Sequence, residues 1–96
     1  MNWQLHVENL GKGEEVSFRP KGNSMRPKIE SGQKVTVSPD VSNIVIGDIV
    51  FCKVKGNFYI HLVKSIDGDR YLIGNNKAGI NGWTRSIFGK VIKVED

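Results

Sequence analysis

Ser24 is the residue whose surroundings most suggest chemistry. It follows Gly22 and Asn23, which favour a sharp turn that can hold a hydroxyl clear of the backbone, and it precedes Met25 and Pro27. A serine hydroxyl is a weak nucleophile until a neighbouring base takes its proton. The stretch is therefore either a nucleophile turn or an ordinary surface turn between two strands, because turn chemistry alone also explains these residue types.

The stretch at residues 22–29 resembles the nucleophile box of the S24/S26 serine peptidases, the group that holds LexA-like repressor peptidases and type I signal peptidases. That box reads Gly, Asp or Asn, Ser, Met, any residue, Pro, any residue and an aliphatic, and every fixed position is matched. The resemblance implies that Ser24 attacks the scissile carbonyl and that N–H groups of its turn stabilise the oxyanion. It also implies that the substrate is bound by Gly22, Asn23, Met25, Pro27 and Ile29, although core packing explains Met25 and Ile29 equally well.

His61 is the candidate base. The stretches at residues 47–50 and 59–63, Gly-Asp-Ile-Val and Tyr-Ile-His-Leu-Val, resemble the second conserved region of the His-type signal peptidases, with Leu62 in place of the usual Arg. A histidine has an ordinary pKa of about 6.5 and is competent as a base near pH 7. The alternative is a histidine that merely packs on a strand face. Lys64 is the rival base, but on a regular strand it points to the face opposite His61.

A histidine base works better when a third group holds its tautomer. The related enzymes supply an Asp for this purpose, but Asn75 stands in the first expected Asp position and Trp83 in the second. The resemblance therefore leaves the orienting acid missing, and Asn75 or Asn76 is expected to orient the ring through its amide oxygen. This departure also favours a second interpretation, a protein that keeps the fold and has lost most turnover.

Composition indicates one small soluble domain spanning residues 1–96. Apolar residues make up 39% and charged residues 25%, and no apolar run approaches the roughly 18 residues of a membrane span. The first residues contain no signal-peptide pattern, so we expect a cytoplasmic protein without a membrane anchor. The single cysteine, Cys52, excludes an internal disulfide, and neither His6 nor His61 has metal-ligand spacing, so no metal or other cofactor is expected.

The formal charge of +4 is spread along the chain rather than clustered, which disfavours a nucleic-acid partner. The expected partner is a peptide or protein substrate, and the sequence gives no indication of oligomeric state. LexA-like repressors cut themselves at an Ala-Gly or Cys-Gly bond that precedes the nucleophile. Here the only such pair is Ala78-Gly79, which follows His61, so cleavage of a separate chain is expected.

Short alternating runs separated by Gly, Pro and Asn predict a mainly β fold, a small coiled β-sheet sandwich or partly open barrel. The catalytic domains of the resembled group, matched here over residues 20–94, have such a fold. Residues 1–19 are expected to form a β-hairpin, because Trp3, Leu5 and Val7 alternate with polar residues.

Further strands are expected at residues 33–38, 49–55, 57–64, 70–73 and 86–94. A hairpin turn at Gly56-Asn57, a loop over residues 74–82, and a helical turn or irregular link at residues 26–31 would connect them. Between residues 58 and 63, the even-numbered side chains should share one face of the sheet and the odd-numbered ones, His61 among them, the other.

Three functions remain open. The leading one is a soluble serine endopeptidase that uses a Ser24–His61 dyad on an extended peptide. The second is a weak or inactive peptide-binding or protein-binding module of the same fold, favoured by the missing Asp residues. The third is a regulator associated with nucleic acid, which a strongly salt-dependent affinity for DNA would support.

Overall fold

The computed structural model describes residues 2–20, 25 and 28–96, and in these residues it contains one helix and seven strands. In chain order they are α1 (Trp3–Gly11), β1 (Val16–Phe18), β2 (Lys34–Ser38), β3 (Ile49–Val54), β4 (Asn57–Asp67), β5 (Arg70–Gly74), β6 (Ile80–Thr84) and β7 (Ile87–Glu95). All neighbouring strands pair antiparallel in one sheet of order β1-β2-β7-β3-β4-β5-β6. The predicted mainly β fold is confirmed.

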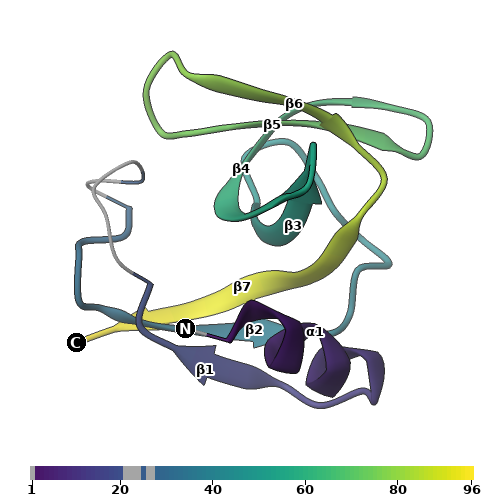
Figure 1. Cartoon of the computed structure of the whole chain (residues 1–96). Coiled ribbons are helices and arrows are strands. Elements are labelled where there is room, and N and C mark those ends of the chain that lie inside the picture. The colour runs from purple at the N-terminus through teal and green to yellow at the C-terminus, as the bar shows by residue number, and fades with distance from the viewer. Residues whose placement is uncertain (1, 21–24, 26–27) are drawn as a thin grey trace.

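The sheet is strongly coiled. The helix α1 with β1, β2 and β7 forms one layer, β5 and β6 form another, and the β3–β4 hairpin lies between them (Figure 1). At the coiled end, the Thr84 hydroxyl donates to the Lys53 carbonyl at 2.6 Å, and the Lys53 N–H donates to the Ser86 carbonyl at 3.0 Å. These bonds bring the end of β6 to β3 without closing the sheet, which gives the partly open barrel that the sequence predicts.

The β3–β4 hairpin is buried on both faces and separates two hydrophobic cores. The helix-side core consists of Leu10, Val16, Phe18, Met25, Ile29, Val35, Val37, Phe51, Ile60 and Leu62. The other core, on the side of β5 and here called the β5-side core, consists of Val50, Cys52, Val54, Val63 and Ile73. Residues of β3 and β4 enter the two cores alternately, because successive side chains of a strand point to opposite faces. The predicted division of residues 58–63 between two faces is confirmed.

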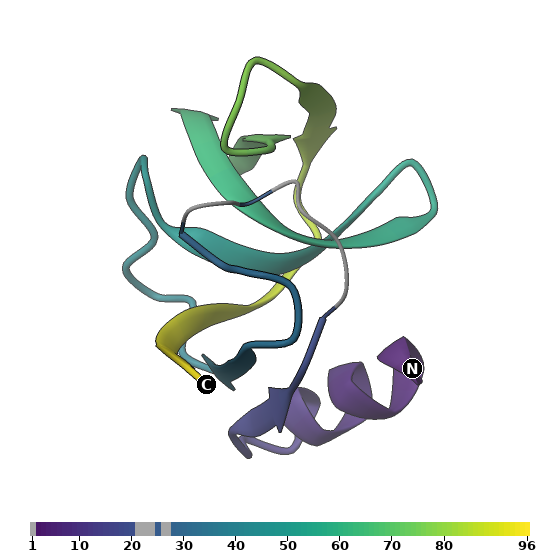
Figure 2. The same cartoon turned by 90° about the vertical axis from the view of Figure 1, so that its left-hand side faces the viewer.

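The expected β-hairpin over residues 1–19 is wrong, because residues 3–11 form a helix. The Asn2 side chain caps it by accepting from the Leu5 N–H at 3.1 Å. The helix runs beside β1 at one end of the molecule (Figure 2). Helical spacing turns Trp3, Val7 and Leu10 toward the core and leaves Leu5 49% exposed, whereas a strand would have buried Leu5 beside Trp3.

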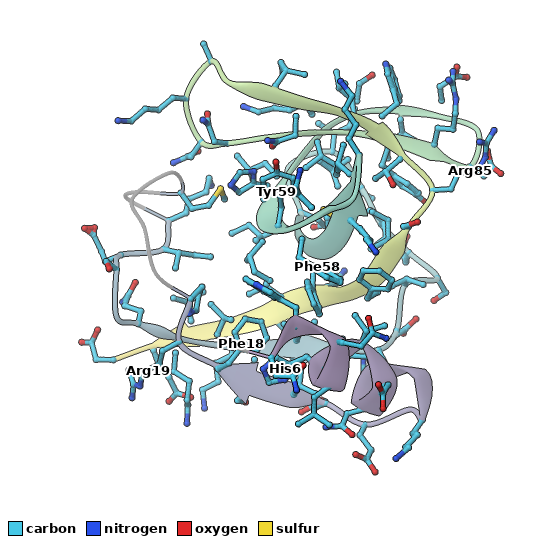
Figure 3. The ribbon with its side chains drawn as sticks, in the orientation of Figure 1. His6, Phe18, Arg19, Phe58, Tyr59 and Arg85 are labelled. Atoms are coloured by element: carbon cyan, nitrogen blue, oxygen red, sulfur yellow. The ribbon has the colours of Figure 1, made fainter. Side chains whose placement is uncertain are left out.

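An aromatic cluster holds the helix in place. The Trp3 ring lies 5.7 Å from Phe18, 5.3 Å from Phe51 and 6.0 Å from Phe58, centroid to centroid. His6, one turn further on, stacks on Phe18 at 4.5 Å, and Figure 3 shows both rings between α1 and β1. These contacts come from β1, β3 and β4, so tertiary packing selects the helix over the strand that alternation alone suggests.

Two connections differ from their expected form, and a third is described only in part. The β3–β4 turn consists of Lys55 and Gly56, not Gly56-Asn57, with φ values of +51° and +84° that fit a two-residue type I′ turn. The loop expected over residues 74–82 is shorter, because β6 begins at Ile80. In the link at residues 26–31, the Ile29 N–H donates to the Met25 carbonyl at 3.0 Å, and residues 26 and 27 lie outside the described residues. No helix in the described chain is long and apolar enough to cross a membrane.

The helix gives a direct test. Trp3→Ala should lower the free energy of unfolding by about 2–3 kcal/mol, somewhat less than for a fully buried ring. Leu5→Ala on the solvent side of the same helix should change it by less than about 0.5 kcal/mol. Urea denaturation measures both. Equal losses in the two variants would indicate a strand, in which both side chains share a face.

Candidate active site

The predicted nucleophile region is only partly described. Ser24, Gly22, Asn23 and Pro27 lie outside the described residues. Met25 and Ile29 are buried in the helix-side core, which also contains Ile60 and Leu62, the residues on either side of His61 along β4. Burial of Met25 and Ile29 agrees with the packing interpretation of these residues. Their contact with a substrate stays a prediction.

His61 lies on β4 opposite Val50 and is 9% exposed. Its ring stacks on Tyr59 with centroids 4.9 Å apart and planes inclined by 29°. Figure 3 shows Tyr59 between β4 and the β5–β6 hairpin. The residue that the sequence predicts as the base is therefore held between strands, with one face of its ring covered by an aromatic side chain.

Asn81 on β6 orients the ring. Its side-chain oxygen Oδ1 lies 2.6 Å from His61 Nδ1. An amide oxygen can only accept a hydrogen bond, so Nδ1 must carry the proton and donate it. The neutral ring then has its lone pair on Nε2, the nitrogen that would take a proton from a nucleophile. This is the tautomer that a general base at this position needs.

Burial lowers the pKa of His61 below its usual value of 6.5, and the hydrogen bond that His61 donates to Asn81 opposes that shift. Burial is the larger influence because the charged ring would lose its hydration. The imidazole is therefore neutral at physiological pH, which is the state in which it can accept a proton.

A β-bulge aims Asn81 at the histidine. Ile73 pairs with Gly82 and Gly74 pairs with Ile80, so Asn81 is an extra residue with no partner on β5. Such a residue bends the strand and redirects its side chain. Gly82 adopts φ +138°, which favours glycine, and Gly74 has no room for a side chain, since a Cβ there would lie 2.5 Å from the Gly79 carbonyl oxygen.

Asn75, the expected orienter, has a different place in the structure. Its Oδ1 accepts from the Lys77 N–H at 2.9 Å and the Gly79 N–H at 3.1 Å, which tightens the β5–β6 loop. The amide that bonds the ring is Asn81, six residues later in the same loop-and-strand region, and sequence reasoning missed it. Only the pairing register of β5 with β6 singles it out, and no local sequence signal marks that bulge.

Two other side chains bear on the choice of nucleophile and base. Lys64, the rival base, sits at a bulge of β4 and donates from Nζ to the Lys77 carbonyl at 3.1 Å, so it supports the β5–β6 loop. Burial raises the pKa of the Cys52 thiol to about 12, which leaves it unreactive near neutral pH.

Within the described ranges, no three His, Cys, Asp or Glu residues gather as metal ligands would.

Comparison with known proteins identifies the family of the chain. A family model described as Peptidase S24-like matches residues 5–92, nearly the whole chain. The matched region includes both Ser24 and His61 and extends further toward the N-terminus than the resemblance seen over residues 20–94. No curated protein matches the chain.

The histidine–amide pair can be tested by NMR. Asn81→Ala should lower the pKa of His61 further, because it removes the hydrogen bond that raises it. It should also reduce stability by about 1–3 kcal/mol, since a buried donor loses its acceptor. Asn81→Asp should raise the His61 pKa, because a carboxylate favours the charged ring. Ring ¹⁵N shifts against pH report the pKa and the tautomer, and Asn75→Ala is the control. A His61 pKa that moves in Asn75→Ala and not in Asn81→Ala would contradict the assignment.

The lowered pKa also predicts how stability depends on pH. Above pH 6.5 both the folded and unfolded states hold His61 neutral. As the pH falls below 6.5 the unfolded chain takes up a proton first, so the free energy of unfolding decreases until the folded pKa is passed. Urea denaturation between pH 5 and 8 should show this decrease, and His61→Gln should reduce it. Burial lowers the pKa of His6 as well, so His6→Gln is needed as a second arm. A decrease that persists undiminished in the double variant would refute the assignment to these rings.

Proposed function

We propose that this chain, which belongs to the Peptidase S24-like family, is a serine endopeptidase with Ser24 as nucleophile and His61 as general base. The observation that carries the proposal is the 2.6 Å contact between His61 Nδ1 and Asn81 Oδ1. A histidine that merely packs needs only hydrogen-bond partners for its ring nitrogens, in either tautomer. This one is buried and neutral, and its bond to Asn81 fixes the tautomer that a general base needs.

The chemistry follows from that tautomer. As the Ser24 oxygen attacks the scissile carbonyl, its proton passes to Nε2 of His61, and the imidazolium then gives this proton to the leaving amine. A water molecule hydrolyses the acyl-enzyme by the same route in reverse. Asn81 holds the ring throughout, because its Oδ1 accepts the hydrogen bond that Nδ1–H donates. A neutral amide serves the same purpose in the Cys–His–Asn sites of papain-like proteases.

The neutral orienter also favours a second candidate function. A carboxylate in this position would stabilise the imidazolium by its charge, and an amide stabilises it only through its dipole. Slow turnover follows, and in the limit the protein would be a peptide-binding module of the same fold. In both cases the proposed partner is an extended peptide or protein segment.

A serine-reactive phosphonate probe tests the dyad. The intact protein should acquire an adduct on Ser24, located by mass spectrometry, and Ser24→Ala should acquire none. His61→Ala should slow labelling by about 10²–10⁴-fold, the usual contribution of a general base. Asn81→Ala should slow it less, because the base remains and only its orientation is lost. Asn75→Ala changes an amide whose bonds to other described residues lie within its own loop, so it should label as the parent protein does.

The pH dependence sharpens the test. The labelling rate should rise with pH and reach half its maximum below pH 6.5, because burial lowers the pKa of His61. No adduct anywhere between pH 6 and 9 would reject the endopeptidase in favour of the binding module. An adduct that survives in His61→Ala at the parent rate would show that another residue is the base.

A further inference from the structure

The strands that carry the site have an excess of positive charge. From β3 through β6, residues 49–84, the sequence has five basic and two acidic residues. Both acids are already paired with arginines: Asp67 with Arg70 at 2.7 Å and Asp69 with Arg85 at 3.0 Å. The remaining basic residues, Lys53, Lys55, Lys64 and Lys77, have no carboxylate within ion-pair distance among the described residues.

Three of these lysines flank Asn81 along β6, Lys55 on one side and Lys64 with Lys77 on the other. A Cβ built on Gly82, the residue after Asn81, would lie 3.3 Å from Cε and 3.7 Å from Nζ of Lys55. On the other side, Gly74 pairs with Ile80, the residue before Asn81, and a Cβ on Gly74 would lie 3.0 Å from Cε of Lys64.

The third lysine is tied to the second, because the Lys64 ammonium donates to the main-chain carbonyl of Lys77, whose own side chain is exposed. Positive charge therefore flanks the residue that orients the proposed base.

We propose that the peptide taken by this site is acidic, with Asp or Glu on both sides of the bond that lies at His61. Carboxylates on one side would meet Lys55, and those on the other side would meet Lys64 and Lys77. That the scissile peptide bond lies at His61 rests on the proposed function. Exposed charge pairs contribute little individually, but several of them on one ligand give specificity and a faster association rate.

A peptide fits this surface better than a single-stranded nucleic acid. Nucleic-acid strands bind where open aromatic rings alternate with cations along a groove. Trp83 is the exposed aromatic residue of β6, and the Arg70 guanidinium already lies over its ring at 5.1 Å. The residue between the lysines is Asn81, whose amide is bonded to the His61 imidazole, and these two polar groups suit a peptide bond.

Fluorescence anisotropy with the full-length Ser24→Ala variant tests the charge preference without cleavage. The probes are three pools of labelled decapeptides that differ only at four positions. These positions hold Asp and Glu in the acidic pool, Asn and Gln in the amide pool, and Lys in the lysine pool. At low salt the acidic pool should bind about tenfold more tightly than the amide pool, the effect of two or three exposed pairs. The preference should vanish near 1 M salt, where the screening length falls to about 3 Å.

Charge reversal localises the effect. Lys55→Glu and Lys77→Glu should each reduce affinity for the acidic pool about three- to fivefold, and the double variant should prefer the lysine pool. Lys12→Glu is the matched control: it makes the same change in net charge at the end of α1, away from the β5–β6 layer (Figure 1), and should have no effect.

Equal binding of the three pools, absence of binding by all of them, or an equal loss in Lys12→Glu would overturn the proposal. So would an oligonucleotide of the same charge that binds more tightly than the acidic pool, because the surface would then be selective for nucleic acid. The phosphonate probe separates this proposal from the function it rests on. Acidic selectivity without a Ser24 adduct rejects the peptidase alone, and an adduct without selectivity rejects the acidic substrate alone.

Discussion

The burial of the β3–β4 hairpin on both faces is the constraint on which the rest of the molecule depends. Alternate residues of each strand must fill different cores, so a slip of one residue would exchange the two sets. Each buried Val, Ile or Phe contributes about 1.5–3 kcal/mol, whereas one hydrogen bond contributes about 1 kcal/mol net. Packing of residues such as Phe51 and Val63 therefore sets the register of β3 with β4. As a consequence, His61 lies on the face of β4 that points to the β5-side core.

Regular pairing alone would not complete the site, and two bulges supply what it lacks. One redirects Asn81 from β6 toward His61, and the other places Lys64 beside Gly74 on the neighbouring strand. Bulges bend strands and increase their twist, so they also help β6 approach β3. The same irregularities thus serve the coiling of the sheet and the local geometry around the histidine.

Sequence reasoning succeeded where a period of two is enforced by burial and bounded by glycine, as in β3 and β4. It failed at residues 3–11 because Trp3 and Val7 satisfy both periods. What decides between them is the Asn2 cap and the aromatic cluster, whose members come from distant strands. It named Asn75 or Asn76 and missed Asn81 for a related reason: a bulge is a property of two paired strands, and neither strand shows it alone.

The neutral orienter and the lysines around it belong to one electrostatic problem. The proposed base would pass through the imidazolium form, which nearby negative charge favours, and neither the Asn81 amide nor Lys55, Lys64 and Lys77 supply any. Burial adds to the difficulty, because it lowers the pKa of His61. Carboxylates of an acidic substrate would neutralise the lysines and so lower the cost of charging the ring. On this view the missing family aspartate is replaced twice: Asn81 takes over its orienting role, and the substrate supplies its charge.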